Sequence, residues 1–150
     1  MTSSVPSQNN STKKMRKITE IIVHCSATPE GKDFTVPDIT RWHKQRGFRT
    51  IGYHYVVYRD GSVHTGRQEG EIGAHCTRHN ACSIGICYIG GVAADGKTAK
   101  DTRTPEQRKA LLMLLRRLRA KYPNAKIHGH RDFAAKACPS FDATKEYAEL

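Results

Sequence analysis

The sequence lacks any long hydrophobic run, and no stretch approaches the roughly 18 consecutive apolar residues that a membrane-spanning helix needs. Residues 1–17 are polar and contain no apolar segment of the kind found in secretory signal peptides. We therefore expect synthesis in the cytoplasm and no insertion into a membrane. The chain has 150 residues, enough for one globular domain and too few for two. We expect a disordered polar and basic leader over 1–17 and a single domain over 18–150.

Acidic residues are scarce, with 14 Asp and Glu against 25 Lys and Arg, which gives a net charge of +11. Such an excess attracts polyanions, either nucleic acid or the acidic polymers of a cell envelope. The basic runs at 13–17 and 116–121 are typical of a solvated tail and a solvated helix face. No aromatic and basic recognition motif accompanies them, so a nucleic-acid-binding module is a remote alternative, and we expect no nucleic-acid partner.

CxxC pairs are also missing, although the chain has five cysteines. An odd number of cysteines is consistent with one acting as a metal ligand, and equally with free buried thiols. Cys76 and Cys82 are close enough in sequence to form a disulfide, which the sequence neither requires nor excludes.

Hydrophobic periodicity and capping signals predict a mixed order of strands and helices. The expected strands are 18–25, 52–58, 62–66, 83–89 and 125–130, and the expected helices are 36–46, 104–121 and 143–150, the last capped by Asp142. Residues 92–103 are polar and charged, and we expect a loose connection there. This order indicates the α/β class, a single domain with a mixed β-sheet flanked by helices.

Alternation along the strands predicts where side chains point. His24 and Cys25 should lie on opposite faces of the first strand. In the strand at 52–58, Tyr53 should share a face with Tyr55 and Val57. Trp42, on the apolar face of the first helix, is interpreted as a core anchor.

A metal site is suggested by the segment 128–142, in which His130 and Cys138 stand eight residues apart. Zinc accepts nitrogen and sulfur ligands together, and a catalytic zinc site has three protein ligands and a fourth position for water. His24, in the apolar run that ends the first strand, is the obvious third donor. His128 and His130 differ by two positions and should face the same side of their strand, so this pattern alone leaves open which of them binds the metal.

The sequence closely resembles the zinc-dependent N-acetylmuramoyl-L-alanine amidases of the bacteriophage lysozyme type, in the wider family that includes peptidoglycan recognition proteins. The matching segments are 22–28 (IVHCSAT), 41–44 (RWHK), 52–54 (GYH), 59–61 (RDG), 73–75 (GAH) with Asn80, 83–85 (SIG) and 136–142 (KACPSFD). They run in order through nearly the whole chain after residue 17. No single segment is decisive, but the ordered set is specific.

The resemblance implies that Zn²⁺ is bound by His24, His130 and Cys138, with zinc in a surface cleft at one end of the sheet. It favours His130 over His128, because the second histidine of the family stands eight residues before the cysteine. Tyr53 and Lys136 match the catalytic residues that do not bind the metal. Tyr53 would either act as a base or orient water. His75 and Asn80 match a segment that lines the substrate groove in relatives and are expected to bind substrate.

The function implied is hydrolysis of the amide bond between N-acetylmuramic acid and L-alanine in peptidoglycan, as in a phage endolysin. The enzyme would be a monomer that acts on the cell wall, in the periplasm or outside the cell, after release by an unknown route. A rival from another class is a peptidoglycan-binding receptor that has lost catalysis. The complete set of expected zinc ligands argues against this rival, because a pure binder has no need of an open metal site.

Overall fold

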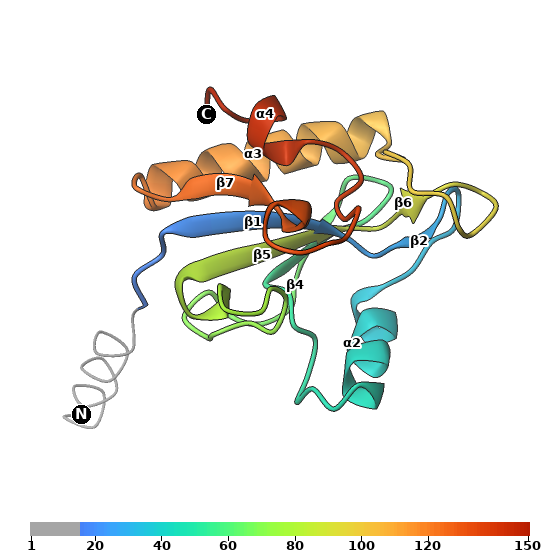
Figure 1. Ribbon diagram of the computed structural model, residues 1–150, viewed down its shortest axis with the longest axis horizontal. Helices are drawn as coiled ribbons and strands as arrows, with labels where there is room; N and C mark the ends of the chain where they lie inside the picture. Colours follow the sequence, from blue (N-terminus) through green and yellow to red (C-terminus); the bar gives the residue numbers. More distant parts are fainter. Residues whose placement is uncertain (1–15) are drawn as a thin grey trace.

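A computed structural model describes residues 16–150 of the chain (Figure 1). The predicted leader at 1–17 lies outside this part except for its last two residues. The strands are β1 Glu20–Cys25, β2 Thr28–Pro29, β3 Tyr55–Val57, β4 Val63–Thr65, β5 Ser83–Tyr88, β6 Gly91–Val92 and β7 Lys126–Gly129. The helices are α2 Val36–Gln45, α3 Pro105–Lys121 and α4 Ala143–Glu146, with 3₁₀ turns at Asn80–Cys82 and His130–Asp132. None of these helices has the length and hydropathy that crossing a lipid bilayer requires.

Five strands form one sheet in the order β4-β3-β5-β1-β7, and β2 and β6 form a small parallel pair. β3, β5, β1 and β7 run parallel to their neighbours, whereas β4 is antiparallel to β3. The α/β class and the mixed sheet predicted from the sequence are therefore confirmed. Because the parallel strands point the same way, their carboxyl ends meet at one edge, where α/β folds place their binding sites.

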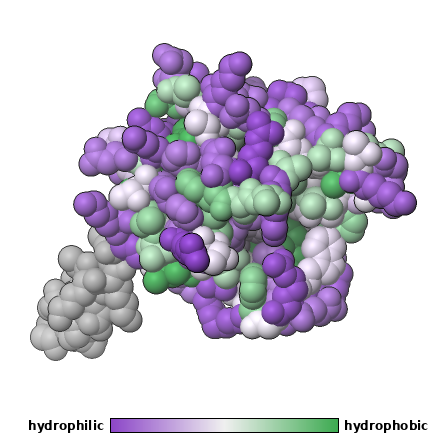
Figure 2. Space-filling model, viewed as in Figure 1, coloured by the Kyte–Doolittle hydropathy of each residue, from purple (hydrophilic) through white to green (hydrophobic). Residues whose placement is uncertain are grey.

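The two faces of the sheet carry separate hydrophobic cores, and helices cover both (Figure 1). Four leucines of α3 pack on the face that contains Ile21, Val23 and Cys25 of β1. On the opposite face, Ile39 of α2 packs with residues that include Cys87 of β5. The predicted opposition of His24 and Cys25 is confirmed, because Cys25 joins the α3 core and His24 lies beside Cys87 in the β1–β5 register. Hydrophilic residues cover most of the face seen in Figure 2.

Both long helices begin as their sequences predict. Thr35 and Thr104 accept hydrogen bonds from the backbone N–H three residues later, and the side chains at those positions bond back to the threonine N–H. These are capping boxes, each with a proline in the first turn. Gln107, the partner of Thr104, is fully buried, and its side-chain amide also donates to the carbonyls of Val57 and Ile89. This cap therefore joins the start of α3 to the ends of two sheet strands.

Arg16, the first residue that the structure describes, contacts segments far along the sequence. The guanidinium of Arg16 donates hydrogen bonds to the carbonyl oxygens of Glu69, Asn80, Ala81 and Ser83, at 2.6 to 3.2 Å. Glu69 lies in the loop after β4, and the other three carbonyls lie in the 3₁₀ turn and at the start of β5. Arg16 therefore stabilises the turn that precedes β5, and the division into a leader at 1–17 and a domain at 18–150 stays a prediction.

Two expectations from the sequence are wrong. β3 begins only at Tyr55, so the alternation drawn over 52–58 does not extend to Tyr53, which packs on the α2 side of the sheet while Val57 packs on the α3 side. The connection at 92–103 is not loose along its length. Val92 pairs with Pro29 and forms a bridge to Ala99. The periodic pattern could not show this, because both features depend on contacts with distant segments.

The end of that connection is held by Arg103, whose side chain is completely buried. Its guanidinium donates to the carboxylates of Asp101 and Glu146 at 2.7 to 2.9 Å and to the hydroxyl of Tyr147 at 2.9 Å. The guanidinium carbon also lies 3.4 Å from the centroid of the Phe141 ring. The ion pairs with these carboxylates raise the pKa of Arg103 even though burial opposes them. Arg103 thus ties α4 to the start of α3.

We expect Arg103→Ala to lower the free energy of unfolding by about 3 kcal/mol, because it removes a completely buried side chain that packs on Phe141 and leaves Glu146 without its cation. Arg108→Ala is a matched control. Arg108 pairs with the same Asp101 at 3.0 Å, but its side chain is 50% exposed, and exposed pairs contribute about 1 kcal/mol or less. Urea unfolding of the three proteins measures the difference. Equal losses in both variants would contradict the assigned role of Arg103.

Candidate metal centre

Two histidines meet at the carboxyl edge of the sheet because β1 and β7 are parallel neighbours. Their register pairs Val23 with Gly129, so the next residues, His24 and His130, lie side by side. The ring centroids are 4.5 Å apart. His130 begins the 3₁₀ turn that follows β7, which turns its ring towards His24. The ring of His128 points elsewhere and lies 3.5 Å from the carboxylate of Asp132.

Cys138 reaches the same place from the loop after the 3₁₀ turn. Its backbone carbonyl accepts a hydrogen bond from the N–H of Arg131 at 2.7 Å, which closes the loop. Its sulfur lies 3.8 Å from Nδ1 of His24 and accepts the backbone N–H of Cys25 at 3.2 Å. A hydrogen bond with the Cys25 thiol and burial raise the pKa of Cys138. Binding of a metal by this sulfur would therefore release a proton.

The three donors fit one tetrahedral ion. The ligand atoms of His24, His130 and Cys138 all lie within 4.8 Å of one another. Zinc bond lengths and a tetrahedral angle require about 3.6 Å between a ligating nitrogen and sulfur, close to the 3.8 Å between His24 and Cys138. Within residues 16–150 this is the one place where three His, Cys, Asp or Glu donors converge in this way. Two imidazoles and a thiolate are ligands that zinc prefers.

Both imidazoles are held in the neutral form that a metal requires. Burial lowers the pKa of His24 well below its usual value, and the positive charges that neighbouring imidazoles would carry lower it further. Burial also lowers the pKa of His130, with a contribution from the ammonium of Lys136. At neutral pH each ring therefore has a free lone pair to offer an ion.

His130 and Cys138 line a cavity of about 440 Å³ between the sheet edge, α2 and the loop at 73–82, and His24 lies buried next to them. Trp42 and His43 of α2 form one wall, together with Phe48. Trp42 thus lines a cavity in addition to packing with Phe34, which the interpretation as a core anchor did not include. Its position on the same helix face as Ile39 and His43 was visible in the sequence, but a face against a core and a face against a cleft have the same pattern.

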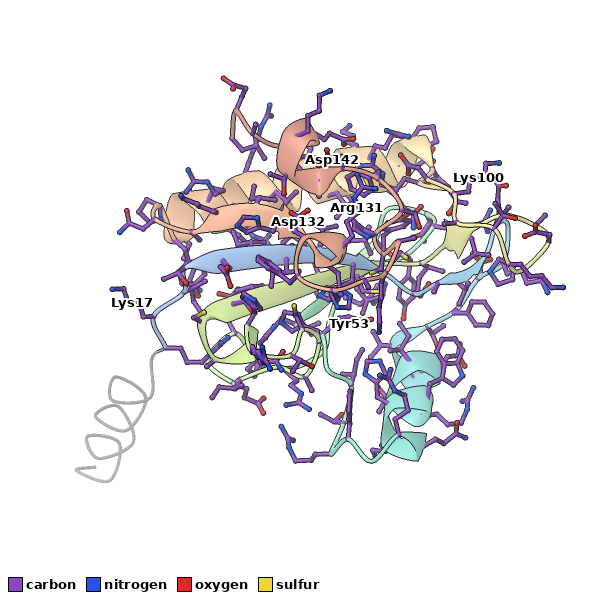
Figure 3. All side chains as sticks on the ribbon, in the orientation of Figure 1. Lys17, Tyr53, Lys100, Arg131, Asp132 and Asp142 are labelled. Carbon is purple, nitrogen blue, oxygen red and sulfur yellow. The ribbon has the colours of Figure 1, made fainter. Side chains whose placement is uncertain are left out.

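Tyr53 and Lys136 both line this cavity. The ring of Tyr53 lies 5.1 Å from the ring of His24 and 5.3 Å from that of His43, and Figure 3 shows it between the sheet and α2. Burial raises the pKa of Tyr53 well above its usual value, so its hydroxyl keeps its proton at neutral pH. Lys136 is exposed, two residues before Cys138, and its charge acts on both histidines.

His75 and Asn80, expected to bind substrate, also line the cavity. The side-chain oxygen of Asn80 accepts the backbone N–H groups of His75 and Cys76, both at 2.9 Å. The two ring nitrogens of His75 contact His24 and Ser83. The contact between His75 and His24 was not foreseen from the sequence. Cys76 and Cys82 are free thiols in this structure.

Comparison with known proteins decides the family. The N-acetylmuramoyl-L-alanine amidase family model matches residues 14–141. The chain belongs to this family. The matched range contains every residue of the candidate centre, and the resemblance read from the sequence is confirmed.

Relatives of this amidase-family chain include phage and animal proteins. The endolysin of Enterobacteria phage K11 is 43% identical over 129 residues, which cover 86% of this chain and 85% of the endolysin. Among solved structures, the N-acetylmuramoyl-L-alanine amidase LysC from Clostridium intestinale has a TM-score of 0.73 at 30% identity, covering 87% of this chain and 82% of LysC. Drosophila PGRP-LB has a TM-score of 0.74 at 27% identity, covering 91% of this chain and 82% of PGRP-LB.

Proposed function

We propose that this protein is a zinc-dependent N-acetylmuramoyl-L-alanine amidase that degrades bacterial cell wall in the manner of an endolysin. The observation that carries the proposal is the convergence of His24, His130 and Cys138 beside a cleft lined by Tyr53 and Lys136. Its family and its relatives, which include endolysins and amidases, support the same reaction. The substrate is the amide bond between the lactyl group of N-acetylmuramic acid and the first L-alanine of the stem peptide.

His24, His130 and Cys138 would hold the zinc ion, which when bound supplies a Lewis acid for activating water and polarising the scissile carbonyl. The cleft brings the amide to these residues from the open side. Lys136 carries a fixed positive charge on the loop beside the ligands. As water adds to the carbonyl carbon, negative charge develops on the carbonyl oxygen, and the ammonium of Lys136 stabilises it.

Tyr53 takes part in proton transfer during this reaction. Because its hydroxyl is protonated in the resting site, it enters the reaction as a hydrogen-bond donor that orients the attacking water and the departing nitrogen. When the C–N bond breaks, the nitrogen must gain a proton, and Tyr53 passes on the proton that the attacking water releases. The products are the free lactyl carboxylate of the sugar and the free amino group of L-alanine.

The protein works as a monomer on peptidoglycan, with residues 1–17 as a leader and 18–150 as the amidase domain. It acts on the cell wall after leaving the cytoplasm. A net charge of +11 favours association with an anionic wall.

The decisive experiment measures zinc content and the release of free L-alanine amino groups from purified peptidoglycan. We expect purified protein to contain zinc, to lose activity when a chelator removes it and to regain activity when zinc is returned. Full activity of the metal-free protein would refute zinc dependence. Binding to peptidoglycan with no release of amino groups would instead favour a receptor that has lost catalysis.

A further inference from the structure

His75 lies directly behind His24, on the side away from Cys138. Nδ1 of His75 is 2.8 Å from Nε2 of His24, and the two rings are perpendicular, with centroids 4.9 Å apart. Nε2 of His75 is 3.1 Å from the hydroxyl of Ser83, the fully buried first residue of β5. The side chains of His24, His75 and Ser83 therefore form a continuous chain of hydrogen bonds from the metal ligand to the sheet.

This chain has one consistent arrangement of protons when Nδ1 of His24 faces the ion. A ligating nitrogen carries no proton, so the proton of neutral His24 must be on Nε2. Nε2–H then donates to Nδ1 of His75, which leaves the second proton on Nε2 of His75 to donate to Ser83. The opposite tautomer of His24 would direct an N–H towards the Cys138 sulfur, 3.8 Å away, and would leave Nδ1 without a lone pair to offer the metal.

Two glycines make room for the flat ring of His75. A Cβ atom added at Gly85 would lie 2.6 Å from two atoms of the His75 ring, and one added at Gly73 would lie 2.7 Å from it. A non-bonded contact of a Cβ atom is essentially never shorter than 3.0 Å, so both positions need glycine while His75 keeps this position. The backbone of His75 is held separately by the side-chain oxygen of Asn80 at 2.9 Å. The position of the His75 ring is thus determined by Gly85 of β5, by Gly73 in the preceding loop and by the side chain of Asn80.

We propose that His75 is a positioning residue for the metal centre, which holds His24 in the tautomer and orientation that present Nδ1 to the ion, with Ser83 completing the support. This inference rests on the proposed zinc site. Outer contacts of this kind commonly set metal affinity. The role differs from the substrate contact expected from the sequence, because a ring with both nitrogens engaged has no free polar atom for a ligand.

The test compares three variants with the wild type: His75→Ala, His75→Asn and Ser83→Ala. Alanine removes the acceptor for His24, whereas the side-chain oxygen of asparagine can stand near the place of Nδ1. We expect the zinc Kd to rise about 10- to 100-fold in His75→Ala, the range typical of a lost outer partner. It should rise less than about tenfold in His75→Asn and about three- to tenfold in Ser83→Ala.

Zinc Kd is measured by competition with a chromophoric chelator, and the visible spectrum of the Co²⁺-substituted protein reports the ligand geometry. Circular dichroism establishes that each variant is folded. Activity at saturating zinc separates kcat from KM. A positioning role changes the Kd and the Co²⁺ spectrum and leaves KM close to that of the wild type.

An unchanged zinc Kd in His75→Ala, with a raised KM, would overturn the inference in favour of a substrate contact. Equal weakening by alanine and asparagine would overturn it as well, because the acceptor would then be irrelevant. If His75→Ala does not fold, Ser83→Ala decides: a Kd within twofold of the wild type rejects the supporting chain. Failure of the wild type to bind zinc would instead refute the proposed function, so the two failures are distinguishable.

Discussion

Replacing Cys138 by serine should remove both the metal and the activity. The thiolate is the only anionic ligand among the three donors, and a serine hydroxyl is a far weaker ligand for zinc at neutral pH. We expect zinc affinity and amidase activity each to fall by more than about 100-fold, beyond the effect typical of losing an outer contact. Zinc content after dialysis and amino-group release from peptidoglycan are the two measurements.

Cys82→Ser is the matched control for that substitution. Cys82 is also a free, partly buried thiol, but its sulfur contacts Glu20 and the carbonyl of His79, away from the three donors. We expect this variant to keep its zinc and its activity. A Cys138→Ser protein that retains stoichiometric zinc would show that the ion binds elsewhere or through the histidines alone.

Replacing Lys136 by alanine, or Tyr53 by phenylalanine, should abolish turnover and spare the metal. Neither side chain is among the converging donors, yet both line the cavity. Loss of a charge that stabilises an oxyanion costs about 10²- to 10³-fold in kcat, and loss of a proton-transfer group about 10²- to 10⁴-fold. Steady-state kinetics on peptidoglycan fragments and zinc analysis of the same preparations measure these effects.

Lys126→Ala controls for the loss of one positive charge, because Lys126 is an exposed residue of β7 that does not line the cavity. Its kcat should equal that of the wild type. A fall in zinc content of Lys136→Ala or Tyr53→Phe would place that residue in the support of the metal instead of the reaction. A kcat within a few-fold of wild type would remove it from the mechanism.

Much of the fold could be predicted from the sequence because its local signals agree with the tertiary structure. The two capping boxes at Thr35 and Thr104 and the leucine face of α3 place the helices closely. β1 and β5 are apolar runs that stay buried on both faces of a parallel sheet, so their period and their length both identify them.

The wrong predictions concern residues whose structure is not set by their neighbours in sequence. Tyr53 looked like part of a regular strand, but β3 starts two residues later, and a loop residue obeys no alternation. Arg103 looked like part of a polar loop, because its acidic partner Glu146 lies 43 residues further along the chain. A buried cation cannot be identified from its neighbours in sequence.

The candidate site was predictable in part for the same reason. Residue types and spacing point to Cys138 with one of two histidines, His128 or His130, and His24 lies near the end of a strand whose neighbour in the sheet could only be guessed. The choice between His128 and His130 needed either the family or the structure, because the strand ends at Gly129 and the 3₁₀ turn separates the two rings. The contact of His75 with His24 depends on the close approach that Gly85 permits.

The pairing of β1 with β7 has a consequence for when this protein becomes active during its synthesis. One histidine lies near the start of the described chain and the other more than a hundred residues later, so they become neighbours only after the sheet has acquired its last parallel strand. A nascent chain still on the ribosome, with β7 unmade, contains His24 without its companions. The three donors therefore cannot converge until β7 and the loop that carries Cys138 have both been made.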